Sequence, residues 1–526
     1  KRLLINYYRS LGYYDVQVLS SNAEISKDNL TTLTYTINAG IRYKITKIST
    51  DVSNVLDKKL FVAMQDLYVK NIGKYYSPFL VKKLLDRLDL LILNNDLQFI
   101  EHSVNEIIDG DKIEIKINVY EGSKQLVERI DVFGNSVTDE AVIRSELLVD
   151  EGDPFNKLKF EKSIAKLKAR NIFGEVKYKI QDGSSSDLKL VQIEVEEKPT
   201  GEISAGAGIG TSGGSFAFNV SENNWLGKGI NLSTSLDVSA ESLSGTLVVT
   251  DPNYNFSGNT LSYFFQNTSN DKPDSGFKNN ISTTGIGTKF EQYNNIYLSP
   301  GIAISYDDLS VQSTASDSLK KQAGGFTDLS FDYGITADNR NRAYSPTDGY
   351  LTRFSQVIPV YADSPAIGST YALNTYQTMT PNVIGSFKFY ATAINGLNDK
   401  DVRISKRARL PSSKLRGFKP GSVGPKDGKD FVGGNYAVAS NFEANLPNFL
   451  PESTKTDVGL FLDFGNVWNV DYDKNMDASN KIRSSVGANV GWLSPAGPMS
   501  FVFSQNLSKA STDVTESFSF RLGTTF

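Results

Sequence analysis

Residues Asp457–Val467 read DVGLFLDFGNV, and the alternation in this stretch decides how the second half of the chain is interpreted. Apolar side chains occupy every second position: Val458, Leu460, Leu462 and Phe464. The positions between them hold a different set: Asp457, Gly459, Phe461, Asp463 and Gly465. Because successive side chains of a strand point to opposite faces, the stretch predicts a strand with one apolar face and one more polar face.

The same period of two continues through residues 200–526, where it predicts about sixteen strands. An even number of antiparallel strands of about ten residues is typical of a transmembrane β-barrel. Trp225, Trp468 and Trp492 fall near predicted strand ends, where the aromatic belt of a membrane barrel lies. A soluble β-sandwich also alternates, and it stays open as an alternative, although it would need all sixteen strands.

Residues 1–199 mix helix and strand, and they repeat. Three similar strands lie about 80 residues apart: LTYTINAG (33–40), KIEIKINVYEG (112–122) and LKLVQIEVEEKP (188–199). Helical segments and a shorter strand precede each of them, which predicts modules of order β-α-α-β-β at 42–122 and 123–199. Residues 1–41 supply only the last helix and two strands of an earlier module, so we expect a truncated module within a longer chain.

The composition argues against several classes of function. The 55 basic and 59 acidic residues give a net charge of −4 and no basic stripe for nucleic acid. There is no cysteine for a thiolate metal site, and the one histidine, His102, has no catalytic or zinc-binding neighbours in sequence. We therefore expect no enzyme, no metal and no cofactor.

One long loop carries an arginine that needs a partner. The stretch Lys414–Pro425, KLRGFKPGSVGP, lies in a predicted loop at 397–433, and structureless loops of this length are usually functional or disordered. Strand alternation places Glu443 and Asp463 inside the barrel on the next two strands. A bidentate contact from Arg416 to this acidic wall is the natural pairing, and the alternative leaves Arg416 in solvent.

The first and last predicted strands differ from the others. The first, GEISAGAGIG at 201–210, directs Ile203 outward and Gly206, Gly208 and Gly210 inward, so it packs and pairs weakly. The last, TESFSFRLGTTF at 515–526, is predicted to close the barrel. Its outward positions are Phe518, Phe520, Leu522 and Phe526.

These segments together resemble the BamA family of outer-membrane protein assembly factors. The resemblance is carried by stretches along the whole chain: VERIDVFGNSVTDEAVIRSELLVDEGDPFN (127–156), NNWLGKG (223–229), SPTDGY (345–350), VGGNYAVASNFEANLP (432–447) and GLFLDFGNVW (459–468). LRGF at 415–418 corresponds to the family's loop-six motif V/I-R-G-F/Y, with Leu415 in place of the usual β-branched residue.

The resemblance implies an architecture of α+β POTRA repeats followed by a sixteen-stranded transmembrane barrel. The expected domains are part of a truncated POTRA at 1–41, POTRA modules at 42–122 and 123–199, and a barrel at 200–526 with a long extracellular loop at 397–433. The loop would tuck into the lumen. The motif Leu415, Arg416, Gly417 and Phe418 would then meet Glu443 and Asp463.

The resemblance also implies a mechanism. A lateral seam would separate the first and last strands, formed by Ile203, Gly206, Gly208, Gly210, Phe518, Phe520, Gly523 and Phe526. Incoming β-barrel proteins would be folded and inserted there without ATP. The expected partners are unfolded outer-membrane proteins, periplasmic chaperones, BamD-like lipoprotein subunits and outer-membrane lipids. The barrel would lie in the bacterial outer membrane and the POTRA modules in the periplasm.

Two groups of alternatives remain at this point. Within the superfamily, the chain could be a TamA-like assembly barrel or a two-partner secretion pore that exports one substrate. Outside it, a barrel enzyme would need a catalytic constellation that one His and no Cys do not provide, and a passive porin would not need the periplasmic modules.

Overall fold

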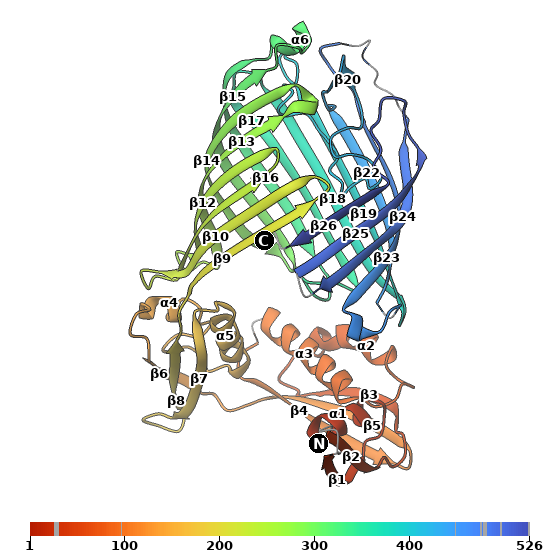
Figure 1. Cartoon of the computed structure of the whole chain (residues 1–526). Helices are drawn as coiled ribbons and strands as arrows, with labels where there is room; N and C mark the ends of the chain where they lie inside the picture. Colours follow the sequence, from red (N-terminus) through yellow and green to blue (C-terminus); the bar gives the residue numbers. More distant parts are fainter. Residues whose placement is uncertain are drawn as a thin grey trace. The chain divides into compact units, whose positions relative to one another are not determined.

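A computed structural model describes most of the chain: residues 1–25, 31–95, 97–447, 449–473, 476, 481–494 and 497–523. The chain divides into two compact units (Figure 1). The first comprises residues 1–136 and 140–198, and the second comprises residues 137–139 and 199–526.

The first unit begins with helix α1 (Arg2–Ser10) and the hairpin β1 (Gln17–Ile25) and β2 (Thr31–Asn38). A three-stranded sheet of order β3-β5-β4 follows, built from β3 (Lys44–Val52), β4 (Ile100–Asp109) and β5 (Lys112–Glu121). Between β3 and β4 the chain forms η1 (Lys58–Met64), α2 (Gln65–Val69) and α3 (Pro78–Asn94). None of the helices in the described ranges is both long enough and apolar enough to cross a membrane.

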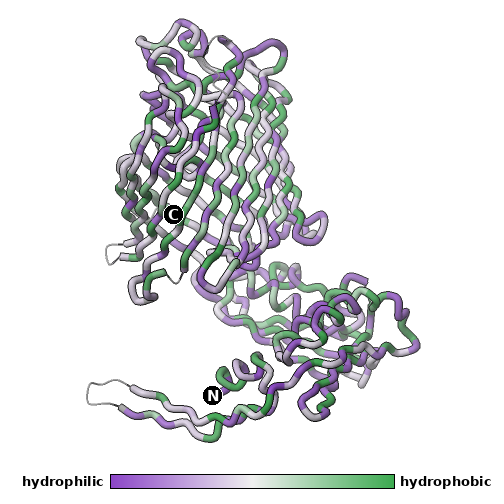
Figure 2. The backbone as a smooth tube through the Cα atoms, turned by 90° about the vertical axis from the view of Figure 1, so that its right-hand side faces the viewer, coloured by the Kyte–Doolittle hydropathy of each residue, from purple (hydrophilic) through white to green (hydrophobic). Residues whose placement is uncertain are grey.

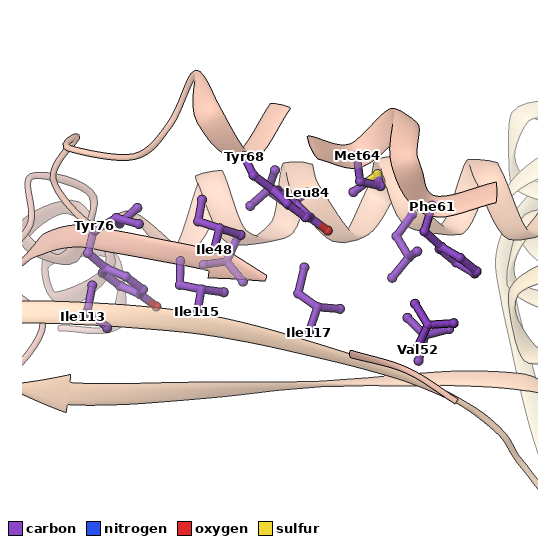
Figure 3. Close-up of a cluster of buried hydrophobic side chains, with 14 of the residues drawn as sticks. Ile48, Val52, Phe61, Met64, Tyr68, Tyr76, Leu84, Ile113, Ile115 and Ile117 are labelled. Carbon is purple, nitrogen blue, oxygen red and sulfur yellow. The ribbon is translucent and has the colours of Figure 1, made fainter. Parts of the chain in front are cut away.

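The core of this sheet lies between the strands and the helices. Ile113, Ile115 and Ile117 alternate along β5 and point toward the helices, as Figure 3 shows. Helix α3 meets them with Leu84 and Leu88, which lie on one helical face because they are four residues apart.

A second module repeats this order of elements. Its sheet has the order β6-β8-β7, from β6 (Leu126–Phe133), β7 (Phe173–Asp182) and β8 (Leu188–Glu197). Helices α4 (Glu140–Arg144) and α5 (Lys157–Ala169) lie between β6 and β7 in the chain. Asn156 caps α5, because its side chain accepts a hydrogen bond of 3.0 Å from the backbone N–H of Lys159. The predicted β-α-α-β-β class is confirmed.

The second unit is a closed antiparallel barrel of sixteen strands within the described residues. The first eight are β9 (Gly201–Gly210), β10 (Gly213–Trp225), β11 (Ile230–Ser239), β12 (Ser242–Tyr254), β13 (Asn259–Lys272), β14 (Phe277–Tyr293), β15 (Ile296–Val311) and β16 (Gly324–Asp338). The others are β17 (Gly349–Ala362), β18 (Ala366–Thr380), β19 (Val383–Gly396), β22 (Tyr436–Leu446), β23 (Thr456–Trp468), β24 (Arg483–Ser494), β25 (Gly497–Ser508) and β26 (Phe518–Gly523). Strand β26 returns to β9, so the predicted barrel is confirmed.

The loops between the barrel strands contain five short elements in the described residues: η2 (Pro273–Ser275), α6 (Asp317–Lys320), β20 (Lys426–Asp427), β21 (Asp430–Phe431) and η3 (Glu452–Thr454). Hydrophobic and hydrophilic residues alternate along the strands of the barrel (Figure 2). In β23, Leu460 is 52% exposed on the outer face, while the neighbouring Phe461 and Asp463 are buried on the inner face. This is the inverse of a soluble protein, and it fits an outer surface covered by lipid.

The last strand differs from its prediction. Alternation predicts a strand from residue 515, but β26 begins at Phe518. The chain bends at Ser517, and the backbone–backbone hydrogen bonds of Val514 and Glu516 are formed with the loop at 397–433. Phe526, which the resemblance assigns to the seam, lies outside the described residues.

Candidate functional site

The loop at residues 397–433, called loop six below, is packed against the inner face of the barrel. Leu415 and Phe418 are each 2% exposed and belong to one apolar cluster. The cluster includes Ala437 and Ala439 of β22 and Val467 of β23. This apolar contact brings Arg416, which follows Leu415 in the sequence, close to the inner wall.

Arg416 binds Asp463 of β23 through a bidentate contact. Its Nε donates to Asp463 Oδ2 at 2.7 Å and its Nη2 donates to Oδ1 at 2.8 Å. The backbone N–H of Arg416 donates to Asp463 Oδ2 as well, at 3.1 Å. The Asp463 side chain is 0% exposed, so these donors compensate the desolvation of its charge.

Glu443 of β22 is the second acidic neighbour of Arg416. Nη1 of Arg416 donates to Glu443 Oε1 at 3.2 Å, and Lys388 of β19 lies 3.1 Å from the other carboxylate oxygen. The guanidinium also lies over the ring of Phe461, 3.7 Å from its centroid. Arg416 is therefore held by two carboxylates and one aromatic face, which a lysine could not match.

Gly417 follows with a backbone conformation that favours glycine. Its φ is +87°, and an added Cβ would lie 3.1 Å from Cβ of Ser485 and 3.2 Å from the side chains of Asn506 and Ser504. The motif therefore needs glycine both for its left-handed backbone and for its close approach to the wall.

The opposite side of the motif contacts β24 and β25. Ser485 of β24 donates through Oγ to the carbonyl of Arg416 at 2.5 Å, and Asn506 of β25 donates to the carbonyl of Gly417 at 2.8 Å. The motif therefore bridges the inner wall from β22 to β25.

The rest of loop six is held by further buried ion pairs. Arg403, 3% exposed, donates to Asp328 of β16 at 2.6 Å, and Arg407 donates to Asp471 at 2.7 Å. These pairs fix the loop at positions well away from the motif, so loop six is a folded part of the barrel interior.

Strands β26 and β9 lie side by side and close the barrel (Figure 1). Within the described residues, Arg521 pairs with Gly210, Leu522 with Ile209 and Gly523 with Gly208. Two of the three β9 residues in these pairs are glycines, and glycine within a strand weakens it.

The other residues assigned to the seam lie beside these pairs. Ile203 is 73% exposed, and both Ile203 and Gly206 lie in the part of β9 that the described residues of β26 do not reach. Phe518 and Phe520 stack at the start of β26, with ring centroids 6.3 Å apart and an interplanar angle of 22°.

A cavity of about 400 Å³ connects the motif to the seam. Its lining includes Arg416 and Phe418 of loop six, Gly210 of β9, and Phe520 and Arg521 of β26. The two groups of residues singled out from the sequence therefore face one shared space inside the barrel.

The sequence did not point to Phe461, Lys388, Ser485 or Asn506. The sequence could have indicated Phe461, because it lies two residues before Asp463 on β23 and therefore on the same inward face. The other three lie on strands whose register against loop six cannot be read from spacing. Within the described part of the chain, no group of three or more His, Asp or Glu side chains is placed to hold a metal ion.

Comparison with family models gives two matches. The model described as the Omp85 superfamily domain matches residues 224–526, and the model of the surface antigen variable number repeat, or POTRA, matches residues 125–198. The first match alone covers more than half of the chain.

Similar proteins and structures agree with these matches. The outer membrane protein assembly factor BamA of Neisseria meningitidis serogroup B is 24% identical, over 99% of this chain and 72% of that protein. BamA of Neorickettsia risticii is 25% identical, over 94% of this chain and 68% of that protein.

Among solved structures, BamA from Haemophilus ducreyi lacking POTRA domains 1–3 has a TM-score of 0.69 at 21% identity, covering 92% of this chain and 100% of that chain. CdiB from Escherichia coli has a TM-score of 0.54 at 14% identity, covering 100% of this chain and 96% of that chain. At these identities the structural likeness shows the fold alone.

Proposed function

The chain belongs to the Omp85 superfamily, and we propose that it is an outer-membrane protein assembly factor that folds and inserts β-barrel proteins through the seam between β9 and β26. The observation that carries this proposal is the make-up of the β9 edge at that seam. Two of the three β9 residues that pair with β26 in the described part are glycines, Gly208 and Gly210. Glycine within a strand weakens it, which favours opening at this junction.

An opened seam would present free strand edges to an incoming protein. Lipid does not satisfy backbone N–H and C=O groups, so an exposed edge is costly until another strand pairs with it. A client strand can supply those hydrogen bonds by adding itself to the edge. Burial of the client's own apolar band, at roughly 25 cal/mol per Å², then supplies the driving force, so no nucleotide is needed.

We propose that residues 42–122 and 123–199 are POTRA modules, that residues 1–41 are the C-terminal part of a truncated one, and that these modules hold extended clients in the periplasm. The modules at 42–122 and 123–199 each contain a three-stranded sheet, and β4 and β7 are edge strands of these sheets. Each can accept an extended segment by the same backbone pairing. Periplasmic chaperones would deliver clients to these edges, and BamD-like lipoproteins would bind this part of the chain.

The proposed location is the bacterial outer membrane, with loop six on the extracellular side. The exposed apolar outer face of the barrel supports a lipid environment: Ile203, Leu236, Phe265, Ile302 and Leu460 are all more than 40% exposed. The relatives named as BamA support an assembly role rather than enzymatic catalysis.

The test is insertion by the purified chain in liposomes without nucleotide. Because the chain has no cysteine, the variant Ile209→Cys/Leu522→Cys can form only the introduced disulfide, which would join two directly opposite seam residues. We expect unfolded outer-membrane protein to insert with the reduced variant and not with the oxidised one. Equal insertion by both forms would overturn the proposal. Export of a single soluble substrate in place of insertion would favour a two-partner secretion pore.

A further inference from the structure

A row of four inward-facing side chains crosses the inner wall beneath loop six. Asp463 of β23 lies directly opposite Asn441 of β22 on one side and opposite Ser485 of β24 on the other. Ser485 in turn lies opposite Asn506 of β25. Asn441, Asp463 and Ser485 are buried. These four residues, called the cradle row below, are therefore neighbouring side chains, one from each of four consecutive barrel strands.

Each member of the cradle row binds one backbone group of loop six through its side chain. The four hydrogen bonds are, in the order of the strands, Asn441 Nδ2 to the carbonyl of Lys414 (2.9 Å), the N–H of Arg416 to Asp463 Oδ2 (3.1 Å), Ser485 Oγ to the carbonyl of Arg416 (2.5 Å) and Asn506 Nδ2 to the carbonyl of Gly417 (2.8 Å). As the loop advances from residue 414 to residue 417, its partner changes from β22 to β23, then to β24 and β25. Loop six thus joins four strands.

These four bonds depend on the register of the strands. A slip of one residue turns the side chains of a strand to the other face of the sheet. A slip of two residues keeps the face but moves each side chain by about 7 Å along the strand. Either slip breaks a bond with loop six, because a hydrogen bond needs a donor–acceptor distance of about 3 Å. The four bonds can therefore form together only in the observed register.

The register of β24 against β25 has the least support from the strands themselves. A β-bulge lies beside the cradle row: Ser484 pairs with Ser508. The next residue, Ser485, pairs with Asn506, so one residue of β25 is left over. The described pairs of β25 with β26 cover residues 499–503 of β25, so Asn506 lies beyond them. At this level the described strand partner of β25 is β24, and loop six supplies a further contact.

Phe461 and Gly487 support the same arrangement one level along the strands. They lie directly opposite each other on β23 and β24. A Cβ added to Gly487 would lie 2.6 Å from Cζ of Phe461, so the ring extends across the glycine. The guanidinium of Arg416 lies over this ring, 3.7 Å from its centroid. The side chain of Arg416 therefore contacts a ring that spans two strands.

We propose that the cradle row and loop six together form a clamp that fixes the register of β22–β25 and holds these four strands as one wall. Asn441, Ser485 and Asn506 are then positioning residues, which act through loop six. The inference rests on the proposed function in one respect: when the seam between β9 and β26 opens, β24 and β25 stay paired. The clamp itself belongs to the folded barrel, so it can be measured without a client.

Amide hydrogen exchange of the purified protein measures the clamp. Arg416→Ala removes a side chain that binds β22 and β23. We expect it nevertheless to speed exchange at residues 484–487 of β24 and 504–506 of β25, because loop six then leaves all four strands. Asn506→Ala should speed exchange of the same amides by about tenfold, since it removes one bond of the clamp. Arg416→Lys, which keeps the charge, should give a smaller increase than Arg416→Ala.

Asn445→Ala is the matched control. Asn445 shares the inward face of Asn441 on β22, and no hydrogen bond joins it to loop six in the described part of the chain. We expect this variant to leave exchange in β24 and β25 unchanged. Faster exchange in Asn506→Ala but in neither variant of Arg416 would show that the hold is local to β25, and the clamp would be wrong. Unchanged exchange in every variant would also contradict it.

A disulfide tests whether β24 and β25 stay paired during insertion. Val486 and Gln505 are directly opposite on these strands, beside the cradle row. Because the chain has no cysteine, Val486→Cys/Gln505→Cys can form only this disulfide. We expect the oxidised protein to insert clients as the reduced protein does, whereas oxidised Ile209→Cys/Leu522→Cys does not.

The two disulfides separate the two claims. Loss of insertion on oxidation of the 486–505 pair would show that β24 and β25 have to part, and the single wall would be wrong while the proposed function stands. Insertion by the oxidised 209–522 variant would overturn the proposed function, and the exchange measurements would still decide whether the clamp exists.

Discussion

Arg416 attaches the motif of loop six to the inner wall of the barrel. It is 14% exposed, whereas Asp463 is fully buried and Glu443 nearly so. A charge in such a place is stable only while its partner is present, because the desolvation of each ion is offset by the other. Loop six is thus attached to the inner wall by an ion pair that holds the loop while both partners are present. Removing one partner leaves the other charge buried and destabilises the protein.

Replacing Arg416 tests this attachment. Arg416→Ala leaves Asp463 buried without its main partner, and breaking a buried pair in this way costs about 3–5 kcal/mol. We expect loop six to undock and insertion to be lost, while the barrel remains embedded and keeps its heat-modifiable migration on gels. Arg416→Lys keeps the charge but not the bidentate geometry, so an intermediate activity should result. Wild-type insertion by Arg416→Ala would contradict a role for this contact.

Gly417 gives a second test at the same scale. Gly417→Ala meets both a φ of +87° and side-chain atoms within 3.2 Å, so we expect it to loosen loop six by roughly 1–3 kcal/mol. Gly428→Ala is the matched control, since Gly428 also has a positive φ, +59°, but no atom lies near its added Cβ. Protease sensitivity of loop six measures the difference. Equal sensitivity of the two variants would show that close approach to the wall is unimportant.

For the strands, the alternation of apolar and polar residues was enough to predict most of the barrel. It also predicted which side of β22 and β23 faces inward. It placed Glu443 and Asp463 on one inner wall, and the structure has both beside Arg416. The start of the last strand could not be predicted. Residues 514–516 alternate like a strand, but their partner is a loop almost 100 residues earlier, and no local pattern carries that information.

Lys388 was missed for a related reason. Its contact with Glu443 follows from the register of β19 against β22, in which Ser386 lies opposite Glu443 and Lys388 opposite Asn441. Register is set by turns and by packing across the whole barrel. Period-two spacing shows which face a residue occupies and not which neighbour it meets.

The helices of the 42–122 module give an independent prediction about packing. Leu88 of α3 is 0% exposed in the module core, whereas Leu90 on the same helix is 42% exposed. Leu88→Ala should therefore destabilise the module by about 2–5 kcal/mol, and Leu90→Ala should cost far less. Thermal unfolding of the full chain, followed by proteolysis of this module, measures both. Similar losses for the two variants would contradict the assignment of this core.

In the molecule as a whole, two kinds of fold place their apolar side chains differently. The modules bury their apolar residues between sheet and helices, as Leu88 and Ile115 do. The barrel exposes its apolar residues outward and fills its interior with loop six. Among the described residues, the barrel strands close on themselves, whereas the sheets of the two modules have edge strands such as β4 and β7. This division fits the proposed function, in which edge strands bind extended clients and the barrel inserts them.

The most direct test of insertion through the seam is to locate a stalled client strand. A photo-crosslinking amino acid in place of Ile203 reports contact with the outer face of β9. The control is the same amino acid in place of Ile286, an exposed residue of β14. With a client arrested during insertion, we expect its last strand to crosslink at position 203 and not at position 286. Equal crosslinking at both positions, or none at 203 while insertion proceeds, would contradict the seam as the site of assembly.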